Sequence, residues 1–191
     1  MDNLSKSLET IKFGQIFSSP QVVILMGLPG SGKSYVADYL HQKYGFTVLS
    51  GENISHALFG DNQADFSLVY KTLRQLALQL LSKGHSIVID GTNLKFSFRQ
   101  QIYDEVCKNI KPILIYLLVD DQTARVRLDS RLVDASSKQN IKSTCSTETF
   151  ADFKQQLEEP LAKEFCYRLL SNENLLKEID NVIKLSNSVY N

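Results

Sequence analysis

The eight residues 27–34, Gly-Leu-Pro-Gly-Ser-Gly-Lys-Ser, have the types and spacing of a loop that wraps around phosphate groups. Glycines at this density let backbone N–H groups converge on an anion without clashes from Cβ atoms. An apolar run precedes the loop and a helical pattern follows it, so a helix N-terminus adds its free N–H groups and its positive dipole end. We expect Lys33 to bridge the β- and γ-phosphates of a nucleotide and the Ser34 hydroxyl to ligate Mg²⁺. The residues expected to bind the nucleotide are Gly27, Pro29, Gly30, Ser31, Gly32, Lys33, Ser34 and Tyr35.

A second polar cluster, Asp90-Gly91-Thr92-Asn93, follows the apolar segment that begins at Ser86. A carboxylate at a strand end can bind Mg²⁺ directly or through water, or orient Ser34, so Asp90 is a candidate metal ligand. The same four residues are also typical of a turn. Thr92 and Asn93 therefore either contact the substrate or only shape the turn.

The elements that must position these clusters alternate between strands and helices. Apolar runs without alternation predict buried strands at 21–26, 46–50, 86–90, 113–119 and 165–170. Helical patterns follow at Ser34–Tyr44, 52–60, 67–83, 97–109, 121–134, 152–164 with a break at Pro160, and 172–186. Strands that alternate with helices indicate an α/β sandwich with five parallel strands, and ligands bind beyond the carboxyl ends of such strands. The segments 27–34, 50–53 and 90–93 all lie at such ends.

Composition sets broad limits on what this chain does. The 191 residues contain 21 Lys and Arg and 21 Asp and Glu, and 43% are hydrophobic, as in an ordinary globular protein. This balance argues against a protein that coats nucleic acid or lies on an anionic membrane. We find no membrane-spanning run and no secretory signal, and the three cysteines are far apart, so we expect a cytoplasmic protein with reduced thiols. Residues 1–19 are expected to form an arm or short helix before one domain, 20–191.

The motifs together resemble the polynucleotide-kinase-like P-loop kinases. The resemblance rests on the loop 27–34, on Val-Ile-Asp-Gly-Thr-Asn at 88–93 and on Arg99 in the next helix, and it covers roughly residues 21–131. It implies a P-loop NTPase three-layer sandwich with a helical lid, and an enzyme that transfers a phosphoryl group from ATP with Mg²⁺. Related enzymes phosphorylate nucleic-acid ends, aminoacyl-tRNA, antibiotics and small metabolites.

The resemblance also implies roles for residues outside the phosphate loop. Glu52 stands where these kinases usually carry an Asp that accepts the proton of the acceptor hydroxyl, and a positioned carboxylate suits that role. Ser55 stands where the polynucleotide enzymes have a substrate-binding Arg, which argues against a 5′-phosphate or nucleic-acid end. Glu52 is otherwise a favourable acid in the first turn of a helix. Arg99 either reaches a substrate phosphate or is a surface residue.

Arg127 and Arg131 match the arginine pattern of the kinase lid. They are four residues apart and so share one helix face. In such kinases lid arginines stabilise charge on the transferring group and exclude water. The alternative is a solvated charged face. We expect the lid at about 121–149, with the polar segment 135–149 as a mobile loop.

These residues predict an ATP-dependent kinase whose acceptor hydroxyl belongs to a small metabolite, a nucleoside or a polynucleotide end. The Asn-Lys-x-Asp motif of guanine-binding proteins is missing, and Thr-Asn-Leu-Lys at 92–95 has the wrong order, which favours ATP over GTP. The alternative is a nucleotide-binding ATPase switch that acts through a protein partner. The sequence identifies no such partner, and we expect no membrane association.

Overall fold

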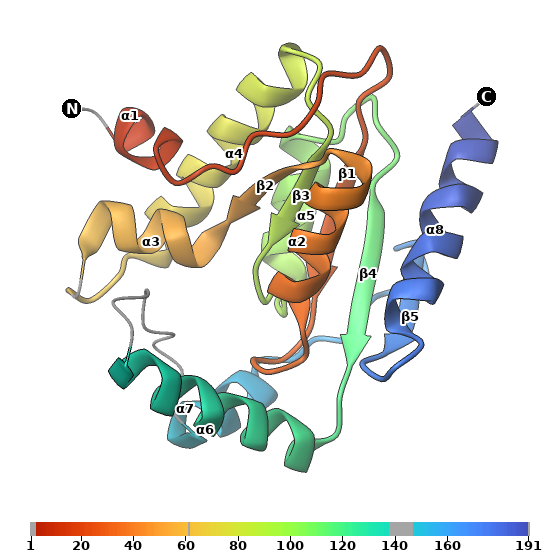
Figure 1. Cartoon of the computed structure of the whole chain (residues 1–191). Helices are drawn as coiled ribbons and strands as arrows, with labels where there is room; N and C mark the ends of the chain where they lie inside the picture. Colours follow the sequence, from red (N-terminus) through yellow and green to blue (C-terminus); the bar gives the residue numbers. More distant parts are fainter. Residues whose placement is uncertain (1–2, 61, 138–146, 191) are drawn as a thin grey trace.

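A five-stranded parallel sheet forms the centre of the computed structural model (Figure 1). The structure describes residues 3–60, 62–137 and 147–190, and side chains within 3–60, 62–130 and 150–186. The strand order is β2-β3-β1-β4-β5, and every neighbouring pair is parallel. The strands are β1 (Val22–Met26), β2 (Thr47–Ser50), β3 (Ile87–Asp90), β4 (Ile113–Leu118) and β5 (Cys166–Leu170). The prediction of five parallel strands is confirmed.

Helices cover both faces of the sheet, as the continuous apolar strands require. One face packs on α1 (Asn3–Leu8), α3 (Gly51–Phe59), α4 (Phe66–Ser82) and α5 (Phe96–Glu105), and the other on α2 (Lys33–Tyr44) and α8 (Leu175–Tyr190). All five residues of β1 are buried, and successive side chains enter the two cores in turn. The three-layer sandwich places the carboxyl ends of β1, β2 and β3 at one edge.

Two further helices, α6 (Asp121–Ser137) and α7 (Thr147–Gln155), lie together beyond the end to which β4 points (Figure 1). A separate apolar cluster joins them to the loop after β1 and to the turn after β3. Its buried members are Leu28, Leu94, Ala124, Leu128 and Phe150. The segment expected as a lid, about 121–149, comprises α6, residues 138–146, which lie outside the described residues, and the start of α7.

The N-terminal arm, residues 9–19, is bonded to the sheet. After α1, an antiparallel bridge joins Lys12 to Val48 of β2, and another joins Ile16 to His85. The Gly14 N–H donates to the Thr47 Oγ1 at 2.9 Å. The arm therefore covers the outer edge of β2.

Several helix boundaries differ from the sequence expectation. The helix expected at 152–164 begins at Thr147, inside the expected loop, because Phe150 is buried against Leu128. It ends at Gln155, and no helix forms from 156 to 164, because carboxylates there accept from the backbone N–H groups of the first residue of α5 and of Leu161. Glu158 accepts from the Phe96 N–H, and Glu164 from the Leu161 N–H at 2.9 Å. In addition, α5 ends at Glu105, four residues before the predicted end at 109.

Candidate active site

The loop after β1 is packed so closely that two of its glycines, Gly27 and Gly30, have no room for a side chain. Gly27, Gly30 and Gly32 have φ angles of 151°, 81° and 92°, where L-residues are rare. A Cβ on Gly27 would lie 2.7 Å from the Leu117 carbonyl oxygen, and one on Gly30 would lie 2.6 Å from that of Ala124. Left-handed glycines before a helix N-terminus turn successive N–H groups inward, as a phosphate-binding loop requires.

Lys33, the first residue of α2, folds over this loop. Its Nζ donates to the Leu28 carbonyl oxygen at 2.8 Å and to the Ser31 Oγ at 3.4 Å, and the side chain is buried. Ser34 and Tyr35 follow on the exposed side of α2. The loop therefore contributes backbone N–H groups and a lysine, and Ser34 an exposed hydroxyl, which are the groups that a nucleoside triphosphate with Mg²⁺ would use.

The carboxylates Asp90 and Glu52 lie at the ends of neighbouring strands. Asp90 is the last residue of β3, is buried, and pairs in register with Ser50 of β2. Ser50 caps α3 by accepting from the Asn53 N–H, so Glu52 lies in the first turn of α3 and is exposed to solvent. The oxygens of Asp90 and Ser34 suit Mg²⁺. Among the described residues, no group of three or more His, Cys, Asp or Glu is arranged to hold a metal without phosphate ligands.

Asn93 shapes the turn after β3 and is not open to a substrate. It is fully buried, with φ 47°, and its Nδ2 donates to the Leu25 carbonyl oxygen of β1 at 2.7 Å. The Tyr70 hydroxyl donates to its Oδ1 at 3.4 Å. One residue earlier, the Thr92 carbonyl oxygen accepts from the Gly27 N–H at 3.1 Å, and Thr92 itself is half-buried. Of the two sequence alternatives, the structure favours the turn-shaping one for Asn93.

Arg99 is fully buried in α5, so the alternative that it is a surface residue is wrong. It forms a bidentate ion pair with Glu164, at 2.7 Å from Nε and 3.0 Å from Nη2. Burial alone raises the carboxyl pKa of Glu164, but the hydrogen bonds from Arg99 and Tyr103 outweigh it and keep that pKa low. Sequence reasoning missed Glu164 because 65 residues separate the partners.

Arg127 of α6 touches the phosphate loop directly. Its Nη1 donates to the Gly30 carbonyl oxygen at 3.2 Å and to the Ser171 Oγ at 2.8 Å. Ser171 follows β5 and was not predicted from the sequence. Arg131 lies one turn further along α6, and its side chain is outside the described residues. The helix face that bears Arg127 is therefore in contact with the loop and is not a free surface.

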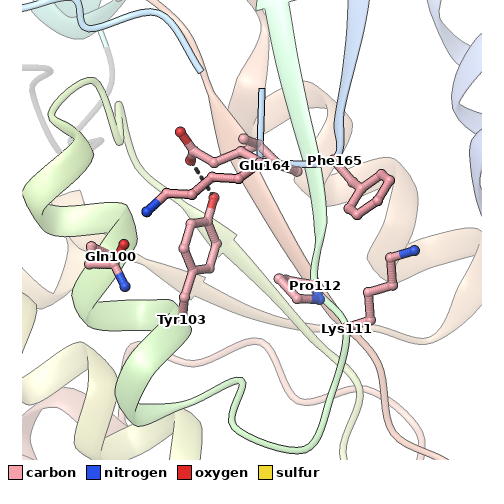
Figure 2. A pocket seen from close by; sticks show the side chains of 8 residues that line it. Gln100, Tyr103, Lys111, Pro112, Glu164 and Phe165 are labelled. Carbon is pink, nitrogen blue, oxygen red and sulfur yellow. Dashed lines mark hydrogen bonds between the residues drawn. The ribbon is translucent and has the colours of Figure 1, made fainter. Parts of the chain in front are cut away.

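A hollow of about 270 Å³ lies at the amino-terminal end of β4, whereas the phosphate loop follows the carboxyl end of β1 (Figure 2). It lies between α5 and the segment before β5, and Pro112 and Leu114 at the start of β4 line it. Tyr103 and Glu164 meet at its wall, where the tyrosine hydroxyl donates to the carboxylate at 2.7 Å. The hollow is not part of the candidate active site.

None of the helices within the described part of the chain is long and apolar enough to cross a membrane.

The geometry of the site defines a class of protein. A glycine loop between a central parallel strand and a helix, with a carboxylate ending the adjacent strand, is the site of a P-loop nucleoside-triphosphate-binding fold. A family model described as an AAA domain (AAA_33) matches residues 22–160, and the chain belongs to this family.

Solved structures share the fold at low sequence identity. A gluconokinase from Sinorhizobium meliloti 1021 superposes with a TM-score of 0.62 and 17% identity, over 92% of this chain and 98% of the other. The Mycobacterium tuberculosis APS kinase CysC, in complex with AMPPNP and APS, superposes with a TM-score of 0.61 and 21% identity, over 88% of this chain and 98% of the other. A chain of the Pnkp1/Rnl/Hen1 RNA repair complex superposes with a TM-score of 0.60 and 20% identity, over 75% of this chain and 45% of the other. The comparison with curated proteins gave no match. The resemblance to P-loop kinases is thus confirmed as a resemblance of fold.

Proposed function

We propose that this protein is an ATP- and Mg²⁺-dependent phosphotransferase that moves the γ-phosphoryl group to a hydroxyl of a small metabolite, a nucleoside or a polynucleotide end. The observation that supports it most is the meeting of the phosphate loop, Asp90 and Glu52 at one edge of the sheet. The similar folds of a gluconokinase and an APS kinase support the same class of reaction.

The nucleotide site uses the loop and the residues that follow it. The turned-in N–H groups and Lys33 would bind the phosphates, while Ser34 and Asp90 would hold Mg²⁺. When bound, Mg²⁺ would neutralise phosphate charge and orient the γ-phosphoryl group. We expect nucleotide affinity to depend on magnesium.

Glu52 is the proposed acceptor-side base. Its place at the start of α3 leaves its carboxylate exposed at the same edge, where it could accept the hydroxyl proton during transfer. Thr92 is proposed to line the acceptor side, while Asn93 supports it from beneath. Replacing Glu52 removes the base without altering the phosphate loop.

The helices α6 and α7 are proposed to act as a lid. Arg127, already on the Gly30 carbonyl, would turn to the transferring group when nucleotide binds, and Arg131 lies on the same helix. The lid pattern and the retained Lys33 and Asp90 favour chemistry over a switch. Since Glu replaces the usual Asp and Ser55 the usual Arg, an ATPase switch that acts through a protein partner remains the second candidate.

The first test is ATP consumption with Mg²⁺, without acceptor and then with pools of nucleosides, 5′-hydroxyl oligonucleotides and small sugars. We expect one pool to stimulate turnover and to yield a phosphorylated product. Slow turnover that no pool changes would favour the switch.

Glu52→Gln tests the acceptor side. We expect acceptor phosphorylation to fall by about 10²–10⁴-fold while ATP affinity stays near that of the wild type, since general-base catalysis contributes this much. The matched control is Glu9→Gln, which removes an exposed carboxylate from the arm. Unchanged turnover in Glu52→Gln would exclude Glu52 as the base.

A further inference from the structure

Arg99 binds the turn after β3 through the turn's own backbone. Its Nη1 donates to the Asn93 carbonyl oxygen at 2.9 Å and to that of Leu94 at 2.8 Å. The guanidinium thereby fixes two consecutive carbonyls, while its other side pairs with Glu164. Planar guanidinium donors fix directions in a way that a single ammonium does not.

The turn after β3 is also hydrogen-bonded to the phosphate loop and to β1. The Thr92 carbonyl accepts from Gly27, the first residue of the loop, and the Asn93 amide binds the Leu25 carbonyl within β1. Asp90, the candidate metal ligand, precedes the turn directly. A displacement of the turn would therefore move both the entry of the phosphate loop and the end of β3.

The partner of Arg99 comes from the segment that follows α7. Within 156–164, the Glu158 N–H donates to the Leu94 carbonyl at 3.1 Å, and the Glu158 carboxylate accepts from the Phe96 N–H at 2.6 Å. Glu164 completes the attachment, with the Tyr103 hydroxyl as an additional donor (Figure 2). The chain that leaves the α6–α7 helices is thus bound at three points, one on the turn and two on the first residues of α5.

The Arg99–Glu164 pair is buried to a degree that makes it costly to break. The side chains are 0% and 2% exposed. Removing one partner of such a pair leaves an uncompensated charge, whereas replacing the whole pair by apolar side chains is often neutral for stability. An apolar replacement of the whole pair can therefore separate its effect on the stability of the fold from its effect on the position of the turn after β3.

We infer that Arg99 is a positioning residue: with Glu164 it fixes the segment after α7 to the turn after β3, and so holds Asp90 and the start of the phosphate loop in place for Mg²⁺-nucleotide. The inference deepens the proposed function and rests on it for the ligand. The competing role is stabilisation of the fold alone, with no effect on the phosphate loop.

The experiment compares three variants with the wild type. Glu164→Gln removes the charge without touching the phosphate loop. The triple variant Arg99→Met/Tyr103→Phe/Glu164→Leu replaces the pair and its tyrosine by apolar groups. The control is Glu105→Gln, which breaks the Arg74–Glu105 ion pair between α4 and α5, at 2.8 Å, away from the turn.

The first measurement is amide hydrogen exchange in the nucleotide-free protein. Exchange at the Gly27 N–H is compared with that at Ile115, whose place within β4 makes it a reporter of global unfolding. We expect Gly27 to exchange about tenfold or more faster, relative to Ile115, in Glu164→Gln and in the triple variant, but not in Glu105→Gln. A Gly27 ratio equal to that of the wild type in both would overturn the inference.

The second measurement is nucleotide affinity by calorimetry, with and without Mg²⁺. We expect the triple variant to lose about tenfold or more of the magnesium-dependent gain in affinity, which is about 1.4 kcal/mol, while binding without Mg²⁺ changes little. A full magnesium-dependent gain in a folded triple variant would overturn the inference. Absence of magnesium-linked binding in the wild type would contradict the proposed function instead, and the exchange measurement, which needs no nucleotide, would still decide the role of Arg99.

Discussion

Gly30 shows how little space separates the phosphate loop from α6. Its φ is 81°, and a Cβ would lie 2.6 Å from the Ala124 carbonyl oxygen. We predict that Gly30→Ala weakens nucleotide binding, because left-handed backbone costs an L-residue about 1–2 kcal/mol and the clash displaces α6 or the loop. Calorimetry with ATP and Mg²⁺ measures the loss.

The chain contains a matched control for Gly30. Gly60 also has a positive φ, 59°, but a Cβ there would meet nothing within 4 Å. Gly60→Ala should carry the backbone cost alone and leave nucleotide affinity unchanged. Equal effects of the two substitutions on affinity would contradict the role given to Gly30.

Lys33 is the side chain on which the nucleotide proposal depends most. Its ammonium lies on the Leu28 carbonyl within the loop, from which it can turn to phosphate. We predict that Lys33→Ala lowers ATP affinity by about tenfold or more and abolishes turnover, since the interaction is with the β- and γ-phosphates. Equilibrium binding of a fluorescent nucleotide tests it, with the exposed Lys108→Ala as control. ATP affinity and turnover that both survive would refute the assignment of this loop.

At the scale of elements, α8 is attached to α2, the helix that starts at the phosphate loop, through Asp180. Burial raises the pKa of Asp180, but hydrogen bonds from Lys43, Tyr39 and Tyr44 outweigh this and lower it to about 2. Since the folded pKa lies below the ordinary aspartate value of 3.8, the ionised carboxylate stabilises the fold above about pH 4. That stabilisation is lost as the pH falls from about 4 towards 2.

Asp180→Asn should therefore lower the melting temperature at neutral pH and flatten its decline between about pH 4 and pH 2. Thermal unfolding at several pH values in that range measures this. Asp152→Asn, at an exposed position of α7, should leave the profile unchanged. A steep acid decline that persists in Asp180→Asn would show that other carboxylates cause it.

Local pattern predicted the elements that bear the phosphate loop, because a buried strand, a glycine loop and a helix are contiguous in sequence. The five strands appear where continuous apolar runs predict them. The helix expected at 152–164 was misplaced, because its polar composition is compatible with helix while Glu158 accepts from the N–H of Phe96, the first residue of α5. A contact between distant segments overrode local propensity there.

Some residues of the candidate site could likewise be predicted from local sequence, and others could not. Lys33, Ser34 and Asp90 follow from motif and strand ends alone. The burial of Arg99 does not, because its partner Glu164 lies 65 residues away and nothing in the local sequence marks either as buried. Ser171, whose hydroxyl oxygen accepts a hydrogen bond from Arg127, was missed for the same reason.

At the scale of the whole molecule, the arm over β2 protects an edge of the sheet. Gly14 lies so close to Gly45 that a Cβ would be 1.9 Å from its carbonyl oxygen. We predict that Gly14→Ala detaches the arm, since backbone cannot give way by that much, and that the uncovered edge promotes self-association. Light scattering after size exclusion tests this against Gly60→Ala; a monomer with an arm still protected from proteases would refute it.

The strand order has a consequence for how the chain is made. The central strand β1 leaves the ribosome before its neighbours, yet Val23 pairs with Val88 and Ile113, and the intervening β2 does not touch it. At a synthesis rate of about 5–20 residues per second, the nascent phosphate loop waits several seconds for both flanking strands. Parallel pairing over such separations is slow, so β1 lacks its partner strands during that interval. A stalled chain that ends before β4 should bind no nucleotide, although it already carries Lys33, Asp90 and every glycine of the loop.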